Sequence, residues 1–384
     1  MTQLEALQRN GIQRRGSARR GFRYHRPGGG RVSAAERERI RALRIPPAWT
    51  EVAITPSARG HLQAVGKDAA GRWQYRYSEA FLERRRRKKF SRLLRFAREL
   101  PAMRKEIEQG LRGRALDQRR VMACIVRILS TCFIRPGSQV YADEHGAYGL
   151  ATLLKRHVTV KGDQVDFDFT GKSHQRQHRA LKDRRVARVV RALLAEAPGE
   201  ALFQFQSETG WVDVRRPHIN AWIKQVMGTA FSAKDFRTWA GTLICACALA
   251  QPDPNAGGGE GQGGGGARRA RRKQVVAAIK RTAQNLGNTP AVCKSAYIDP
   301  SVLKRFEKGQ VLDQAASSLE ALQAGSGTAL LRSERALLAL LERSEPADTR
   351  PRPHARSRRV PSARRGGKRA SHRTGRGSRR RAGV

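Results

Sequence analysis

The spacing of apolar residues changes once along the chain, close to residue 80. From Gly21 to about Tyr77 the sequence consists of short segments broken by Gly and Pro, which is typical of strands and turns, with one helix near Ala34–Arg44. Beyond residue 80, apolar residues recur at every third or fourth position, which is the period of a helix that buries one face. The pattern therefore predicts a small β-rich part followed by a larger, mostly helical part.

One segment of the helical part has the pattern of strands instead. Residues 157–169 (HVTVKGDQVDFDF) alternate Val and Phe with polar side chains around Gly162 and Asp163, which predicts a β-hairpin. A third, basic strand is expected at Ser173–Ala180. The other segments predict helices at about 80–110, 115–134, 183–196, 217–227, 232–250, 267–286 and 301–312, with one or two more before residue 344.

These segments predict an α+β protein with two folded domains and flexible additions. We expect a flexible basic arm at 1–20, a β-rich N-terminal domain at 21–95 and a larger, mostly helical domain at 96–344. Residues 251–266 (QPDPNAGGGEGQGGGG) cannot pack and predict a surface insertion within the larger domain. Residues 345–384 contain Arg, Ser, Pro and Gly with almost no apolar residue, which predicts a disordered basic tail.

The charge of the chain indicates what kind of partner it binds. Its 384 residues include 77 Lys and Arg against 32 Asp and Glu, which gives a formal net charge of +45. So strong a positive field attracts polyanions, nucleic acid first and an anionic membrane surface second. The sequence has no apolar run of membrane-spanning length and no signal-peptide core at its N-terminus, so we expect a cytoplasmic protein with no membrane partner.

The sequence contains no pattern that predicts a bound metal or nucleotide. The five cysteines form no CxxC pair, so we expect buried free thiols in a reducing compartment. His174 and His178 stand four residues apart without a third ligand. Neither a carboxylate cluster for Mg²⁺ nor a GxxxxGK[ST] loop is present, and we expect no cofactor.

The stretch NLGNTPAVCKSAYID, residues 285–299, contains the first candidate for chemistry. Thr289 can cap a helix whose first position is Pro290, and Tyr297 then falls near the far end of that short helix. Taken alone, a tyrosine in this position is more often a packed side chain than a nucleophile. Its interpretation depends on the charged residues elsewhere in the chain.

Four residues together would form a site for phosphoryl transfer: Arg135 at a helix end, Lys172 on the hairpin, Arg237 in a helix, and Tyr297. Attack of a phenolic oxygen on a phosphodiester develops negative charge on the non-bridging oxygens, and two arginines can each donate bidentate hydrogen bonds to them. A lysine can give the leaving alkoxide its proton. The chemistry would be a reversible transesterification through a phosphotyrosine bond.

At these residues the chain resembles the type IB DNA topoisomerases in their small poxvirus-like and bacterial form, over roughly residues 21–315. The matching segments are FIRPGSQVYADEHGAYGLATL, FDFTGK, KDFRTWAGT and LGNTPAVCKSAY, in the family's order. The resemblance implies that Arg135 and Arg237 are the catalytic arginines and that Lys172 is the general acid. It also implies that Tyr297 attacks the 3′-phosphate and releases a 5′-hydroxyl.

The resemblance has further implications for the fold and the partners. It implies a β-rich domain and a mostly helical domain that form a clamp around double-stranded DNA. It also implies a nucleoid-associated monomer that relaxes supercoils without ATP or metal. Gln74, Tyr75, Tyr77 and Tyr141 would contact the DNA. Asn288 stands where poxvirus members have a histidine, and its amide can still donate a hydrogen bond to a non-bridging oxygen.

Two other functions agree with part of the sequence. A tyrosine recombinase (integrase) uses the same Arg–Lys–Arg–Tyr chemistry, but such enzymes usually show H-x-x-R at the second arginine, where this chain has Lys234 in KDFR. Their N-terminal domain is also helical. A non-enzymatic, nucleoid-type DNA-binding protein would explain the charge but not the ordered motifs.

Overall fold

The computed structural model of the chain describes residues 1–251, 264–318, 321–322, 328 and 330–343. All of these belong to one compact unit, residues 1–344. Most of the predicted insertion at 251–266 and all of the predicted tail at 345–384 lie outside the described residues. The predictions for these two segments therefore stay predictions.

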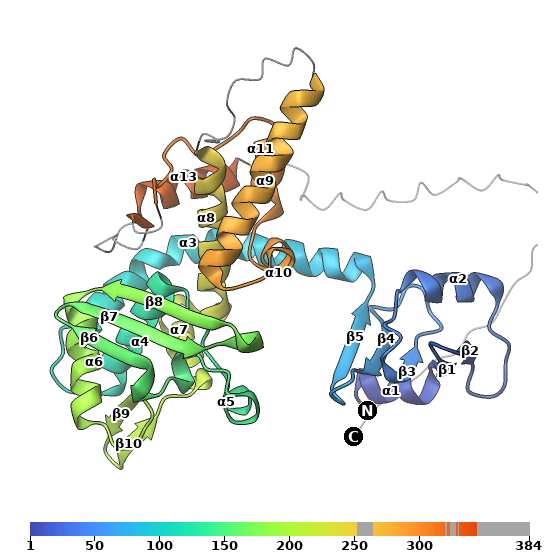
Figure 1. Cartoon of the computed structure of the whole chain (residues 1–384), viewed down its shortest axis with the longest axis horizontal. Coiled ribbons are helices and arrows are strands. Elements are labelled where there is room, and N and C mark those ends of the chain that lie inside the picture. Colours follow the sequence, from blue (N-terminus) through green and yellow to red (C-terminus); the bar gives the residue numbers. More distant parts are fainter. Residues whose placement is uncertain (252–263, 319–320, 323–327, 329, 344–384) are drawn as a thin grey trace, which may run out of the picture. The chain divides into compact units, whose positions relative to one another are not determined.

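A sheet of five antiparallel strands forms near the N-terminus, in the order β2-β1-β3-β4-β5 (Figure 1). Its small core contains Ile12, Ile40 and Ile54, which are almost completely buried. Two short helices belong to this part, one before β1 and one between β2 and β3. The elements are α1 (Gln3–Asn10), β1 (Ile12–Ser17), β2 (Gly21–His25), α2 (Ala34–Ala42), β3 (Thr50–Ile54), β4 (Leu62–Lys67) and β5 (Trp73–Tyr77).

The prediction of a flexible arm at residues 1–20 is wrong. Thr2 caps helix α1 by accepting from the backbone N–H of Glu5, and the Glu5 side chain accepts from the N–H of Thr2 in return. Ile12 then pairs with Ile54 in the sheet and is fully buried. The capping pair, the burial of Ile12 and the packing of α1 against β3 and β4 hold this segment in place despite its many arginines.

The long helix α3 (Glu79–Gly110) connects the N-terminal sheet to the rest of the chain. Ser78 caps it by accepting from the N–H of Phe81. Residue 95, where the sequence predicted a domain boundary, lies inside this helix, so no linker separates the two parts there. Its apolar face, which includes Phe96 and Met103, packs against α4, α7 and α8 of the larger core.

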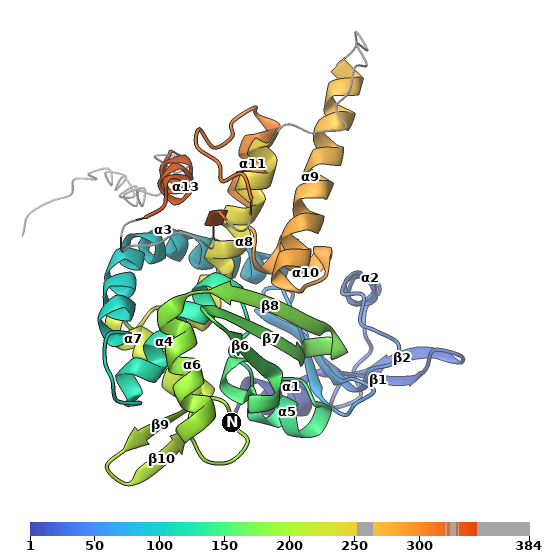
Figure 2. The ribbon, with the colours of Figure 1, turned by 60° about the vertical axis from the view of Figure 1, so that its left-hand side comes forward.

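The predicted hairpin is confirmed, and β6 (Val158–Lys161) pairs with β7 (Gln164–Thr170) across the Gly162–Asp163 turn. β8 (Arg176–Lys182) adds the third strand and begins three residues later than the sequence predicted. The strands form one sheet in the order β6-β7-β8, with α4 and α6 packed against it (Figures 1 and 2).

The remaining helices surround one large core. α8 is buried along most of its length, and α9 runs beside it in both views (Figures 1 and 2). These helices are α4 (Gln118–Cys132), α5 (Gln139–His145), α6 (Arg184–Glu196), α7 (Arg216–Met227), α8 (Ala233–Ala250), α9 (Gly264–Leu286), α10 (Pro290–Ala296), α11 (Pro300–Glu307) and α13 (Arg332–Glu342).

Most predicted elements are present, but helix α1 and strand β1 within residues 1–20 were missed, as were two features farther along the chain. The short helix α5 and a second hairpin, β9 (Gln204–Ser207) with β10 (Gly210–Asp213), do not follow from the apolar spacing. The mixture of helices and small antiparallel sheets confirms the α+β class. In the part of the chain that the structure describes, no helix is both long and apolar enough to cross a membrane.

Candidate active site

Arg237 in α8 is buried to 2% exposure. One terminal nitrogen donates to the carbonyl of Phe133, just beyond α4, and the other donates to the carbonyl of Leu286 at the end of α9 (2.8 Å). Phe133 adopts the left-handed conformation (φ 55°), which ends α4 there. Arg237 therefore ties the ends of two helices together.

Arg135 lies two residues beyond Phe133, after the end of α4, and its side chain also reaches the connection between α9 and α10. One of its terminal nitrogens donates to the carbonyl of Gly287 (2.9 Å) and to the side-chain oxygen of Asn288. Arginine can only donate, so the Asn288 amide must present its oxygen to Arg135 and its NH₂ group elsewhere. The NH₂ group lies 3.5 Å from the carbonyl of Leu286, which is at most a weak hydrogen bond.

The turn between α9 and α10 is held by strand β8. Gly287 adopts φ +58°, and a Cβ there would lie 2.5 Å from the side-chain oxygen of Gln177. Arg179 donates to that same oxygen (3.0 Å) and to the carbonyl of Asn285 (3.2 Å). Sequence reasoning missed Gln177 and Arg179. The alternation of β8 could have revealed them, because every second side chain of the strand faces the core. Gln177 and Arg179 lie on that face together with Leu181.

Tyr297 occupies the end of α10, as the sequence predicted. Thr289 caps the helix by accepting from the N–H of Val292 (3.3 Å), and Pro290 is its first residue. The N–H of Tyr297 donates to the carbonyl of Cys293 (2.9 Å), and the carbonyl of Tyr297 accepts from the hydroxyl of Thr242 in α8 (3.2 Å).

Two guanidinium groups determine the electrostatic environment of the Tyr297 phenol. Burial acts to raise the pKa of Tyr297, but the charges of Arg237 and Arg135 outweigh it and lower that pKa below its ordinary value. Burial and the like charge of Arg135 lower the pKa of Arg237 to about 10. The guanidinium is therefore still protonated at neutral pH, and the site stabilises an anion.

Lys172 stands apart from this cluster. It lies on an exposed 3₁₀ turn between β7 and β8, where Ser173 and His174 both adopt positive φ (62° and 55°). Among the described residues, no hydrogen bond or ion pair links Lys172 to Arg135, Arg237 or Tyr297. The structure brings the two arginines, Asn288 and the tyrosine together and leaves the lysine on the neighbouring strand connection.

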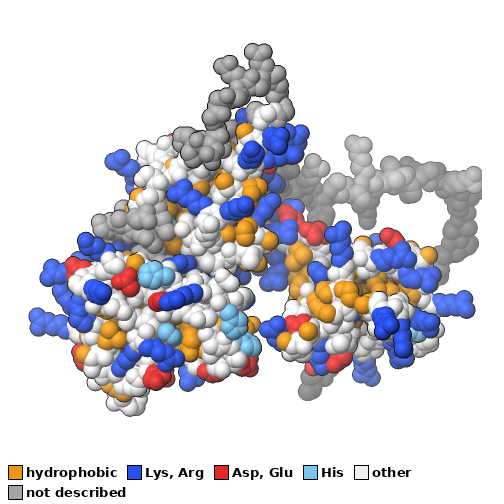
Figure 3. Space-filling view, in the orientation of Figure 1, with side chains coloured by type: hydrophobic (Ala, Val, Ile, Leu, Met, Phe, Trp, Pro, Cys, Tyr) orange, Lys and Arg blue, Asp and Glu red, His pale blue; other side chains and the backbone are white. Residues whose placement is uncertain are grey.

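The four predicted DNA contacts lie on two surfaces. Tyr75 and Tyr77 share one face of β5, with ring centroids 6.3 Å apart, while Gln74 donates to the carboxylate of Asp68 (2.8 Å). Tyr141 is 43% exposed on α5. The face of the molecule in Figure 3 carries many Lys and Arg side chains and few Asp and Glu.

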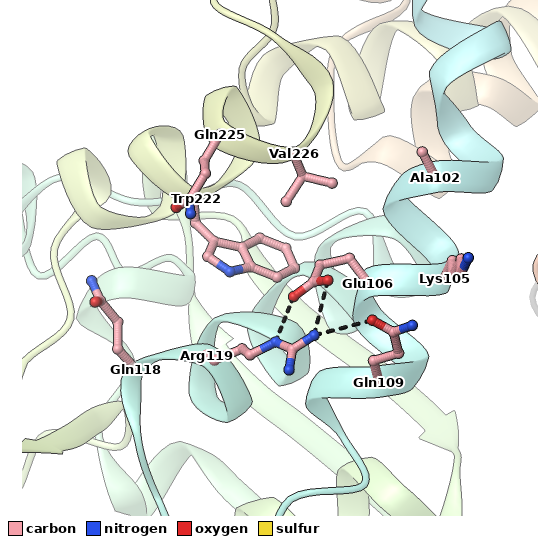
Figure 4. A pocket seen from close by; sticks show the side chains of 9 residues that line it. All are labelled: Ala102, Lys105, Glu106, Gln109, Gln118, Arg119, Trp222, Gln225 and Val226. Atoms are coloured by element: carbon pink, nitrogen blue, oxygen red, sulfur yellow. Dashed lines mark hydrogen bonds and ion pairs between the residues drawn. The ribbon is translucent and has the colours of Figure 1, made fainter.

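A hollow of about 610 Å³ lies elsewhere, between α3, the start of α4 and α7 (Figure 4). Two of its charged groups pair with each other, since Arg119 donates to both oxygens of Glu106 (2.7 and 3.0 Å) and also to Gln109 (3.1 Å). Trp222 covers this pair, and none of the predicted catalytic residues lines the hollow. The hollow is therefore separate from the arginine–tyrosine cluster.

The cysteines agree with the sequence analysis. All five are free and buried. Burial raises the pKa of Cys293, which lies one turn before Tyr297, to about 11, so its thiol is neutral at physiological pH. It contributes packing beneath the tyrosine.

Comparisons with known proteins identify the family. A family model described as "Eukaryotic DNA topoisomerase I, catalytic core" matches residues 78–322, and one described as "Bacterial DNA topoisomerase IB, N-terminal domain" matches residues 21–68. A DNA topoisomerase 1B of Acanthamoeba polyphaga mimivirus is 30% identical over 302 residues, which cover 77% of this chain and 88% of the viral protein. The DNA topoisomerase 1B of vaccinia virus (strain Copenhagen) is 24% identical over 282 residues, which cover 72% and 83% of the two chains. The chain therefore belongs to the type IB DNA topoisomerase family and is an enzyme of that class.

Proposed function

We propose that the chain relaxes supercoiled duplex DNA by a reversible transesterification in which Tyr297 is the nucleophile. The phenolic oxygen forms a bond to the 3′-phosphate, the phenol loses its proton, and the 5′-oxygen leaves and takes up a proton. The reverse reaction reseals the strand without external energy. The observation that carries the proposal is the pair of guanidinium groups, Arg135 and Arg237, that lowers the pKa of the Tyr297 phenol.

The arginines and Asn288 would stabilise the charge that develops on the non-bridging oxygens. The Nε atom of Arg237 is buried and has no hydrogen-bond partner among the described residues. The NH₂ group of Asn288 has at most a weak one. Donors that are already held in place suit a transition-state anion, because they need no reorganisation when the charge appears.

Lys172 is the proposed general acid for the 5′-oxygen. Its exposed turn between β7 and β8 leaves the ammonium free to reach a bound phosphate. A 5′-bridging phosphorothiolate tests this role, because the sulfur leaves without needing a proton. Lys172→Ala should lose most cleavage on the ordinary strand and recover it on the phosphorothiolate, while Arg135→Ala recovers much less. Equal recovery of both variants would remove the general-acid role.

The partner and the form of the enzyme complete the proposal. We infer that it acts as a nucleoid-associated, cytoplasmic monomer and that the β-rich and helical parts clamp duplex DNA, to which Gln74, Tyr75, Tyr77 and Tyr141 contribute contacts. The net charge of +45 supports a polyanionic substrate. Sedimentation of the purified chain with and without a short duplex tests the monomer.

Relaxation of supercoiled plasmid in EDTA without ATP tests the function itself. We expect both positive and negative supercoils to be removed. Strand exchange restricted to particular sites would favour a recombinase instead. Plasmid binding without a change of topology would favour a structural DNA-binding protein.

A further inference from the structure

Lys89 of helix α3 makes an unusual contact with the end of α10. Its ammonium group donates a hydrogen bond to the carbonyl of Ala296, the residue just before Tyr297. The same nitrogen lies 5.8 Å from the centroid of the Tyr297 ring. Its neighbour Lys88 is exposed and makes no such contact, so the inward orientation belongs to Lys89 alone of the two.

We propose that Lys89 is a positioning residue for the nucleophile: its ammonium group anchors the C-terminal end of α10 and thereby fixes the place of Tyr297. The proposal rests on the proposed role of Tyr297 and adds a residue outside the four that carry the chemistry. It predicts that strand cleavage depends on the charge of Lys89 through the place that this charge gives to Tyr297.

The need for such an anchor follows from the size of α10. The helix has seven residues, too few to be stable by themselves, and its last carbonyls have no partner within the helix. Thr242 of α8 satisfies the carbonyl of Tyr297, and Lys89 of α3 satisfies the carbonyl of Ala296. A cation at a helix C-terminus is also favoured by the helix dipole, and a charged donor makes a stronger hydrogen bond than a neutral one.

The charges around Lys89 oppose one another. Lys234 and Asp235 face it from α8, Arg92 faces it from α3, and Asp299 faces it from the segment after α10. Burial, and after it the charge of Lys234, lower the pKa of Lys89 to about 8, and the two carboxylates offset only part of this. Asp235 is itself shared with Arg92, which donates to it at 2.6 Å.

This environment gives the charge of Lys89 a definite pH dependence. The ammonium is present at neutral pH and is lost as the pH rises through about 8. An anchor that requires the charge therefore weakens at alkaline pH, and cleavage should fall with it. Arginine at this position would keep its charge throughout that range.

Single-turnover cleavage of a duplex at saturating enzyme, followed from neutral to alkaline pH, tests the proposal. We expect the wild-type rate to fall as the pH rises through about 8. Lys89→Arg should keep cleavage and lose this alkaline fall. Lys89→Met should cleave slower at every pH, by about 10- to 100-fold, because displacing the nucleophile by about 1 Å has an effect of that order. Lys88→Met, which removes the same charge from the exposed neighbour, should follow the wild-type profile.

Two outcomes would overturn the proposal: an alkaline fall that Lys89→Arg leaves unchanged, or a Lys89→Met rate equal to that of the wild type. Thermal melting and duplex binding are measured for each variant beside its cleavage rate. If Lys89→Met does not fold, the comparison of wild type with Lys89→Arg decides alone. A wild-type chain that cleaves no duplex would contradict the proposed function instead.

Discussion

The guanidinium carbon of Arg237 lies 5.1 Å from the centroid of the Tyr297 ring. Both residues are held in place without a substrate. The side chain of Arg237 donates to the carbonyls of Phe133 and Leu286, and the carbonyl of Tyr297, at the end of α10, accepts from the hydroxyl of Thr242. The positive charge and the phenol are therefore fixed relative to each other by two helices, α8 and α10. Such preorganisation is the main way in which a protein stabilises a transition-state anion.

Replacing Arg237 with lysine tests whether this fixed geometry matters beyond charge. Lysine keeps the charge but lacks the planar fork whose two terminal nitrogens each reach one carbonyl, so we expect cleavage to fall by about 10²–10³-fold. Leaving one buried carbonyl unpaired should also lower the free energy of unfolding by about 1–3 kcal/mol. Cleavage rates and denaturant unfolding measure the two effects. Arg98→Lys, in an exposed pair with Glu342, is the matched control, and an equal effect there would contradict this account.

Asn288 can be tested by separating its two hydrogen-bonding groups. Its oxygen accepts from Arg135, and its NH₂ group is the part left to donate to a phosphate oxygen. Asn288→Asp keeps the acceptor and removes the donor, so we expect a loss of about 10²-fold in cleavage with little loss of stability. Asn288→His keeps a donor and should retain more activity. If Asn288→Asp cleaves the duplex as fast as the wild type, then the Asn288 amide does not donate to the phosphate.

Gly241 of α8 lies against Tyr297, the proposed nucleophile, and a side chain there would displace it. A Cβ at Gly241 would lie 2.8 Å from the carbonyl oxygen and 2.9 Å from the Cβ of Tyr297. Gly241→Ala should therefore shift Tyr297 and slow cleavage, with a loss of stability of about 1–3 kcal/mol from overpacking. Gly113→Ala is the control, since its Cβ would meet only ordinary contacts at 3.5 Å and beyond. Unchanged cleavage in Gly241→Ala would show that the helices can adjust.

The sequence was most informative where a local rule determines the structure. The Thr289 cap and Pro290 predicted helix α10 and the place of Tyr297, and the Gly162–Asp163 turn predicted the β6–β7 hairpin. These features depend on residues within a few positions of each other, so no long-range contact is needed to find them. The same reasoning failed for residues 1–20, where one buried isoleucine and a capping pair outweigh a basic, Gly-containing composition.

The contacts that assemble the site could not be predicted in this way. Arg237 reaches the carbonyls of Phe133 and Leu286, and Arg179 reaches Asn285, across distances in sequence that no periodicity describes. Lys89 sits in a run of eight residues of which six are Arg or Lys (RRRRKKFS), and its composition does not distinguish it from Lys88. Only the fold, which brings Lys89 of α3 to the carbonyl of Ala296 at the end of α10, sets one of them apart from the other.

The central claim is that Tyr297 forms the covalent bond to DNA. Its most direct test is to trap the reaction on a nicked or truncated duplex, digest the protein and identify the peptide that carries the nucleotide, with Tyr297→Phe run in parallel. This account predicts DNA joined through its 3′-phosphate to the peptide that contains Tyr297. It also predicts no adduct and no plasmid relaxation for the phenylalanine variant, which should still bind duplex. An adduct on another tyrosine, or relaxation by Tyr297→Phe, would contradict it.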